Sequence, residues 1–103
     1  MSKVYDESIR MLKEILGQVF KPGEVKVVLF GSRARGDHLQ TSDIDLGILP
    51  QGQPPSYQRK LALLRERLEN SNIPYKVDIV DLSQVDDEFA QQALSKGVMI
   101  WKG

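Results

Sequence analysis

The sequence predicts an α+β fold in which helices back a mixed β-sheet, and three observations support this class. Segments with apolar residues at three- and four-residue spacing alternate along the chain with short β-branched or period-two segments. Clusters of breaker residues separate these segments. The length of 103 residues suits one domain with one core, so we expect a single domain over residues 1–103.

The first thirty residues predict a helix followed by a buried strand. Residues 2–19 carry a helical apolar stripe, made of Ile9, Leu12, Ile15, Leu16 and Val19. Pro22-Gly23 ends this helix. Residues 25–30 are apolar and β-branched, which indicates a buried strand. Gly31 ends the strand, and Ser32 is placed to cap a short helix over residues 33–35.

The middle of the chain predicts a strand with two different faces. Residues 43–49 alternate, with Ile44, Leu46 and Ile48 on one face and Asp43, Asp45 and Gly47 on the other. A loop rich in breakers follows over residues 50–55. Residues 56–70 then form an amphipathic helix, whose buried stripe is Tyr57, Leu61, Leu64 and Leu68.

The last third predicts strand, helix and strand. In residues 75–80, Val77 and Ile79 face opposite to Asp78 and Val80. Asp86 or Asp87 caps a helix that runs to residue 96, with Gly97 at its C′ position. Residues 98–101 suit a short terminal strand. The order leaves open whether the two acidic strands are parallel, and a helix-backed mixed sheet covers both cases.

Composition excludes several classes of function. The 14 basic and 14 acidic residues balance, which argues against broad, charge-driven binding of nucleic acid. Without cysteine there are no disulfides and no thiolate metal sites. The N-terminus becomes charged too early for a secretory signal, and no apolar run approaches the length of a membrane span. We therefore expect a cytoplasmic protein that does not contact a membrane.

Three aspartates predict a metal site. Asp43 and Asp45 stand two residues apart on one strand, so their side chains leave the same face. Asp78 repeats this arrangement on another strand, and the three carboxylates converge if the two strands are neighbours. Mg²⁺ prefers such oxygen ligands, commonly one or two carboxylates together with substrate phosphates. The competing interpretation is a solvated strand face without a ligand.

The sequence Gly31-Ser32 predicts a phosphate-binding turn. A strand that turns sharply into a helix leaves backbone N–H groups free for phosphate, and glycine allows a close approach. Arg33 and Arg35 are either nucleotide contacts or exposed helical arginines, and Ser42 either caps the strand or touches the metal's water. His38 is interpreted as a surface residue, and Asp81 as the end of a strand. Trp101 either packs on the sheet or forms part of a surface that binds a partner protein.

These residues carry a resemblance to a known family. Gly31-Ser32, ten further residues and Asp43-Ile44-Asp45 form the G-S-x10-D-x-D signature of the polymerase-beta-like nucleotidyltransferase superfamily. The stretch GSRARGDHLQTSDIDLGIL resembles its minimal nucleotidyltransferase (MNT) branch, and Asp78 in KVDIVDL matches the third carboxylate. The resemblance covers nearly the whole chain and implies the polymerase-beta-like nucleotidyltransferase fold.

What the resemblance implies is a metal-dependent transfer of a nucleoside monophosphate, AMP from ATP, to a hydroxyl acceptor. Asp43 and Asp45 would bridge two Mg²⁺ ions, with Mn²⁺ as an alternative, and Asp78 would hold the ion on the nucleophile side. Gly31 and Ser32 would hold the β- or γ-phosphate. All three aspartates would thus be both catalytic residues and metal ligands.

The MNT branch also implies a partner. Its members commonly pair with a small helical HEPN protein that resembles an RNase toxin, and act as antitoxins by adenylylating a toxin tyrosine. The short chain is consistent with an acceptor surface on such a partner. Two alternatives stay open: a nucleotide-binding subunit that neutralises a partner without turnover, and transfer to a small molecule or an RNA end.

Overall fold

The fold consists of three helices and four strands, and the computed structural model describes residues 3–30 and 44–102. The elements follow one another as α1 (Lys3–Val19), β1 (Val25–Phe30), β2 (Ile44–Pro50), α2 (Tyr57–Glu69), β3 (Val77–Asp81), α3 (Asp87–Lys96) and β4 (Val98–Lys102). Each agrees with a predicted element to within two residues. The short helix predicted over residues 33–35 lies outside the described residues.

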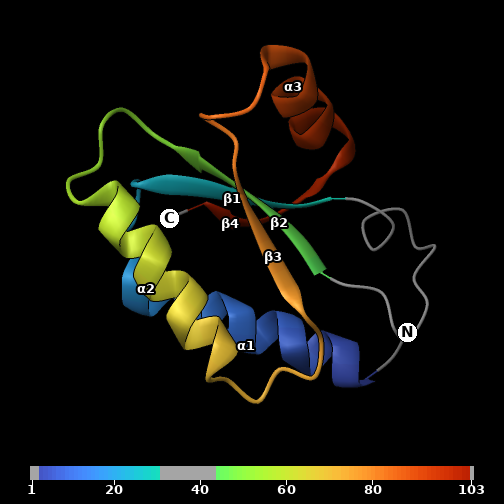
Figure 1. Cartoon of the computed structure of the whole chain (residues 1–103). Coiled ribbons are helices and arrows are strands. Elements are labelled where there is room, and N and C mark those ends of the chain that lie inside the picture. The colour runs from blue at the N-terminus through green and yellow to red at the C-terminus, as the bar shows by residue number, and fades with distance from the viewer. Residues whose placement is uncertain (1–2, 31–43, 103) are drawn as a thin grey trace.

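The four strands form one mixed sheet with the order β3-β2-β1-β4. Strand β1 pairs antiparallel with both β2 and β4, whereas β2 and β3 are parallel. The parallel pair needs a crossover, and α2 supplies it. Helices α1 and α2 lie against one face of the sheet and α3 lies on the other (Figure 1). This arrangement confirms the predicted helix-backed mixed sheet.

The main core lies between the sheet and the helices α1 and α2. Ile44, Leu46 and Ile48 are fully buried there, which confirms the predicted apolar face of β2. The α2 stripe points into the same core, with Leu61, Leu64 and Leu68 buried and Tyr57 partly so. Trp101 packs onto this core as well. The burial of alternate strand residues means that the intervening residues emerge on the α3 face.

The α3 face of the sheet has a smaller apolar cluster. Val28, Leu82 and Ala93 form its buried centre. Gly47 belongs to this face, because a Cβ atom at position 47 would lie 2.8 Å from Leu82 Cδ1 and 3.1 Å from Val28 Cγ2. A larger residue here would displace the packing under α3.

Helix α3 begins as predicted but does not end as predicted. Asp86 is its N-cap, since its Oδ1 accepts a hydrogen bond from the Phe89 N–H at 2.8 Å. Gly97, however, has φ −79° and ψ 168°, so it is extended and not the left-handed C′ residue we expected. Glycine is required there for space: a Cβ atom would lie 2.9 Å from Leu29 O and closer still to Ala93 O.

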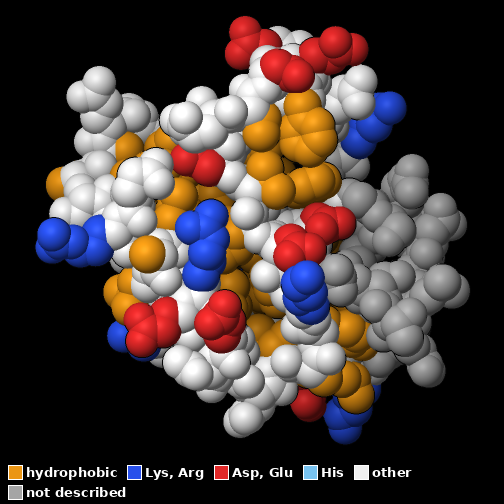
Figure 2. Space-filling view, in the orientation of Figure 1, with side chains coloured by type: hydrophobic (Ala, Val, Ile, Leu, Met, Phe, Trp, Pro, Cys, Tyr) orange, Lys and Arg blue, Asp and Glu red, His pale blue; other side chains and the backbone are white. Residues whose placement is uncertain are grey.

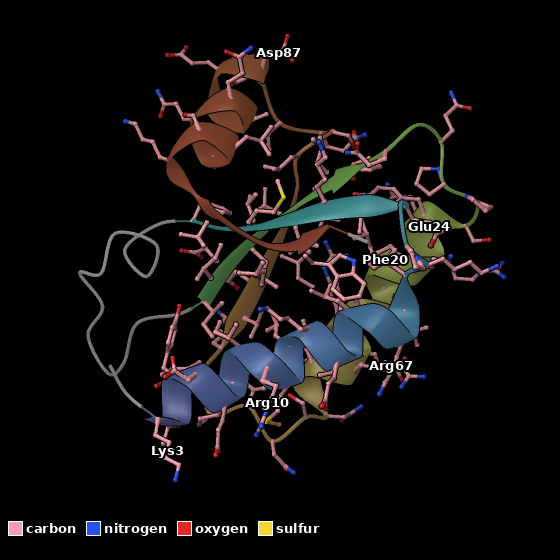
Figure 3. All side chains as sticks on the ribbon, turned by 180° about the vertical axis from the view of Figure 1, so that it is seen from behind. Lys3, Arg10, Phe20, Glu24, Arg67 and Asp87 are labelled. Atoms are coloured by element: carbon pink, nitrogen blue, oxygen red, sulfur yellow. The ribbon has the colours of Figure 1, made fainter. Side chains whose placement is uncertain are left out.

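A polar contact joins α2 to the turn that follows α1. Lys60 Nζ lies 2.8 Å from Glu24 Oε1 and 2.9 Å from Oε2. The Lys21 N–H donates to Glu24 Oε1 at 2.7 Å. The Lys60 hydrogen bond, followed by that of the Lys21 backbone, lowers the pKa of Glu24. Figure 3 shows Glu24 and Phe20 close together at this end of the molecule. In residues 3–30 and 44–102, no helix is both long and apolar enough to cross a membrane.

Candidate functional site

Asp45 and Asp78 occupy facing positions on the two parallel strands. The register of β2 and β3 pairs the Cα atoms of Asp45 and Asp78. Neighbouring strands run about 4.8 Å apart, and residues in register leave the same face of a sheet. The structure thus meets the condition on which the predicted convergence of carboxylates depended, namely that the two acidic strands are neighbours.

The surroundings of Asp78 leave its carboxylate open to solvent. Its side chain is 45% exposed, and Lys76 Nζ stands 4.0 Å from its Oδ1. The Lys76 side chain is itself 73% exposed, so this ion pair is weak and screened. The flanking Val77 and Ile79 turn to the main core, as predicted. Asp78 is therefore held by a partly buried strand while its carboxylate is presented on the α3 face.

The end of strand β1 lies next to Asp45. Phe30, the last residue of β1, is the register partner of Asp45. In the sequence, Gly31-Ser32 follows Phe30 immediately. The strand that leads into the predicted phosphate-binding sequence is therefore hydrogen-bonded to the strand that carries Asp45. The predicted site residues Gly31, Ser32, Arg33, Ser42 and Asp43 lie outside the described residues, as do Arg35 and His38.

The described carboxylates suit a hard divalent cation. Asp45 and Asp78 supply oxygen donors from adjacent strands on one face, and Mg²⁺ is typically bound by one or two carboxylates plus phosphates and water. Across residues 3–30 and 44–102, no group of three or more His, Cys, Asp or Glu residues is placed to hold a metal ion. The predicted third member, Asp43, is outside those ranges.

An aromatic pair with one exposed ring borders this face, and sequence reasoning did not single it out. The rings of Phe30 and Phe89 meet edge to face, with centroids 5.9 Å apart and an interplanar angle of 89°. Phe89 in the first turn of α3 is 43% exposed. Figure 2 shows hydrophobic side chains gathered below α3 beside acidic ones. The sequence carried one signal for Phe89. It stands three residues after Asp86, the N-cap of α3, and this spacing places it on the first turn of that helix.

Asp81 is separate from the carboxylate pair, as predicted. Its Oδ1 accepts hydrogen bonds from Ser83 N–H at 3.0 Å and Ser83 Oγ–H at 2.6 Å. The Tyr57 hydroxyl also donates to Oδ1, at 2.9 Å. Burial raises the pKa of Asp81, but the hydrogen bonds from Ser83, Tyr57 and Gln58 outweigh burial and lower it. Asp81 therefore closes the turn after β3 and joins it to α2.

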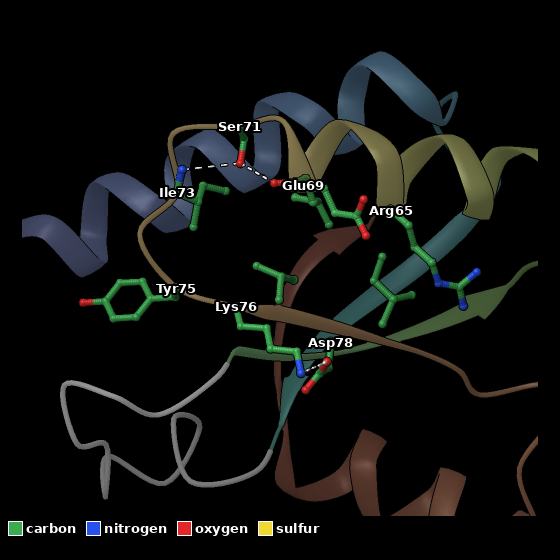
Figure 4. A pocket seen from close by; sticks show the side chains of 10 residues that line it. Arg65, Glu69, Ser71, Ile73, Tyr75, Lys76 and Asp78 are labelled. Atoms are coloured by element: carbon green, nitrogen blue, oxygen red, sulfur yellow. Dashed lines mark hydrogen bonds and ion pairs between the residues drawn. The ribbon is translucent and has the colours of Figure 1, made fainter.

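A cavity of about 470 Å³ lies between α2 and the outer edge of β3 (Figure 4). Arg65 and Glu69 on α2 line one side, and Lys76 and Asp78 on β3 line the other. Its apolar lining is contributed by Leu68, Ile73, Val77 and Ile79. The cavity therefore reaches Asp78 from the side away from Asp45. Sequence reasoning missed it, because it depends on how far α2 stands from the edge strand.

Comparison with known proteins assigns this fold to a family. Residues 11–103 match the family model described as "Polymerase beta, Nucleotidyltransferase". The match spans β1, β2 and β3, and thus all three predicted aspartates. It also contains the Gly31-Ser32 sequence.

Individual relatives agree with the family match. The chain is 28% identical over 88 residues to a Haemophilus influenzae protein named "Probable protein adenylyltransferase MntA", covering 85% of this chain and 74% of that protein. A Sulfolobus solfataricus structure described as a "putative nucleotidyltransferase" is 33% identical, with a TM-score of 0.56, covering 99% of this chain and 90% of that one.

A third similarity is to a complex. In the structure of a tri-AMPylated Shewanella oneidensis HEPN toxin with its MNT antitoxin, the matched chain has a TM-score of 0.58 and 20% identity. It covers 95% of this chain and 72% of that one. At this identity the likeness shows a shared fold.

Proposed function

This chain belongs to the polymerase beta nucleotidyltransferase family, and we propose on that premise that it transfers AMP from ATP to a hydroxyl of a partner protein. The acceptor oxygen would form a bond to the α-phosphorus of ATP as the bond to the β-phosphate breaks. Pyrophosphate would leave, and the acceptor's proton would pass to solvent. In this proposal, residues 1–103 act as one minimal nucleotidyltransferase domain.

The pairing of Asp45 with Asp78 is the observation that carries the proposal. Two carboxylates in register on one face repel one another, and a cation bound between them would offset that repulsion. Asp43, two residues before Asp45, would complete the set. Divalent ions held by these aspartates, Mg²⁺ first and Mn²⁺ as an alternative, would lower the pKa of the acceptor hydroxyl and stabilise the leaving pyrophosphate.

The residues after β1 are proposed to hold the nucleotide. Phe30, the last residue of β1, is the register partner of Asp45, and Gly31-Ser32 follows Phe30 in the sequence, which supports this assignment. Backbone N–H groups at such a turn favour phosphate, and Ser32 adds a hydroxyl donor. We assign the β- or γ-phosphate to Gly31 and Ser32, and further nucleotide contacts to Arg33 and Ser42. Asp78 would then act on the acceptor side.

A HEPN-family protein is the proposed partner, with one of its tyrosines as the acceptor. This is supported by the name of the Haemophilus influenzae relative, a protein adenylyltransferase, and by the Shewanella oneidensis structure, in which an AMPylated HEPN toxin binds an antitoxin of this fold. On this proposal the chain is an antitoxin that inactivates its partner by covalent modification.

The test is a labelling experiment on the chain and its proposed HEPN partner, which is to be sought in the reading frame beside its own. With Mg²⁺ present, label from α-labelled ATP should enter the HEPN protein, whereas label from γ-labelled ATP should not. Mass spectrometry should locate AMP on a tyrosine, and one pyrophosphate should be released for each AMP transferred. Omission of the divalent cation is the control. Complex formation without pyrophosphate release would contradict the proposal and indicate a binding subunit instead.

A further inference from the structure

The outer edge of β3 offers backbone groups that no described strand occupies. Strand β3 stands at the end of the sheet order. Ile44 N–H donates to Lys76 O at 2.8 Å, and Leu82 N–H donates to Ile48 O at 2.9 Å. Along a strand, successive residues direct their N–H and C=O groups to opposite sides, so the N–H and C=O groups of Asp78 and Val80 bond to β2. Val77 and Ile79 therefore direct their N–H and C=O groups outward.

The residues that carry these outward groups line the cavity described above. Val77 and Ile79 both line it, and Leu68 of α2 forms part of the opposite wall. Arg65 and Glu69 add a charge of each sign to that wall (Figure 4). The cavity thus lies beside a polar backbone edge and has an apolar wall. An extended peptide could pair its main chain with the edge and place one of its alternate side chains against the wall.

Asp78 connects this edge to the carboxylate pair. A strand added outside β3 would lie about 4.8 Å away, the same spacing that separates β2 from β3. A residue of that strand opposite Asp78 would project from the α3 face, beside the Asp78 carboxylate. Its side chain would stand in the same relation to Asp78 as Asp45 does from the other side.

We propose that an extended, hydroxyl-bearing segment of the acceptor protein docks on the edge of β3 as an added strand. Its backbone pairs with the N–H and C=O groups of Val77 and Ile79, and its alternate side chains enter the cavity beneath α2. The hydroxyl side chain projects on the α3 face next to Asp78. Only a polypeptide repeats N–H and C=O groups at the interval of about 6.6 Å that separates Val77 from Ile79. This inference rests on the proposed function, because it names where the acceptor binds.

Amide exchange tests the docking without altering the chain. In the free chain, the Val77 and Ile79 amides should exchange rapidly, while the Asp78 and Val80 amides, which pair with β2, serve as protected internal controls. On binding the HEPN protein used in the labelling experiment, exchange at Val77 and Ile79 should slow by about tenfold or more. Unchanged exchange in the complex would overturn the proposal. Slowing that depends on the concentration of the chain alone would assign the edge to a second copy, and also overturn it.

A proline substitution provides the functional readout. Ile79→Pro removes one outward donor, and proline is tolerated on edge strands whose N–H faces solvent. The variant should keep its affinity for Mg²⁺-ATP and lose transfer to the acceptor, whereas Gln53→Pro in the loop before α2 should keep both. Full transfer by Ile79→Pro would contradict the docking proposal. Failure of the wild-type chain to transfer label would contradict the proposed function alone, because amide protection reports on docking without catalysis.

Discussion

The Tyr57 hydroxyl donates a hydrogen bond of 2.9 Å to Asp81 Oδ1, joining the start of α2 to the end of β3 across 24 positions of the chain. The Tyr57 ring also packs near Phe20, with centroids 6.4 Å apart. Burial first, and then the hydrogen bond and charge of Asp81, raise the pKa of Tyr57 well above its usual range. This bond fixes α2 relative to β3, and with it the wall of the cavity.

Removal of the Tyr57 hydroxyl should therefore destabilise the fold. Tyr57→Phe keeps the ring packing and loses the bond to a charged acceptor, for which we expect a loss of about 1–2 kcal/mol in the free energy of unfolding. Urea denaturation measures the change. The double variant Tyr57→Phe with Asp81→Asn is the control, and it should lose less than the sum of the single variants. Additive losses would contradict the assigned bond.

Asp81 should also make the free energy of unfolding depend on pH. In the folded chain burial acts to raise the pKa of Asp81, but its hydrogen bonds from Ser83, Tyr57 and Gln58 hold that pKa below its ordinary value of 3.8. A lowered pKa contributes stability that is present above the unfolded value and is lost as pH falls through the folded value. The wild-type chain should thus be more stable than Asp81→Asn at about pH 7, and the difference should shrink below about pH 3.8. A difference that stays constant under acid, measured by urea denaturation, would contradict this.

Gly97 should resist substitution for steric reasons. A Cβ atom there would press against Ala93 O and lie 2.9 Å from Leu29 O, both backbone atoms that cannot yield cheaply. Gly97→Ala and Gly97→Asn should each cost about 1–3 kcal/mol of unfolding free energy. The asparagine variant separates the two explanations, since asparagine is tolerated at a left-handed C′ position. A near-neutral Gly97→Asn would contradict the extended conformation found here.

Lys76 should weaken cation binding at the carboxylate pair. Its Nζ lies 4.0 Å from Asp78 Oδ1 and competes for the same carboxylate. Lys76→Gln should lower the dissociation constant for Mg²⁺ by about two- to fivefold at low salt, the range expected of an exposed ion pair. Calorimetric titration measures the constant, and Lys26→Gln on β1 is the matched control. An equal change in both variants would point to net charge and not to the pair.

Much of this fold could be predicted because its strands have unlike faces. In β2 the apolar residues alternate strictly with Asp45 and Gly47, so the period alone separated the buried from the presented side. The caps were harder. Asp86 was one of two candidates, and Gly97 was given a conformational role when its actual requirement is space, set by Ala93 O in its own helix and by Leu29 O on another element. Local sequence does not carry such tertiary contacts.

The sequence predicted which types of residue form the site, but it did not predict what surrounds them. Asp45 and Asp78 stood out by period, but their pairing depends on the parallel order of β2 and β3, which the sequence left open. The cavity along the edge of β3 could not be predicted, because it depends on the strand order and on how far α2 stands from that edge. Gly31, Ser32 and Asp43, which lie outside the described residues, remain predictions from motif spacing.

The most direct test of the central claim is label transfer by Asp45→Asn. This variant keeps the shape of the side chain but removes the charge that would hold a divalent ion. Transfer of α-label to the HEPN protein should fall by about a hundredfold or more, with folding and complex formation retained. Asp87→Asn, on the exposed first turn of α3, should transfer label at the wild-type rate. Equal transfer by Asp45→Asn and the wild-type chain would contradict the account.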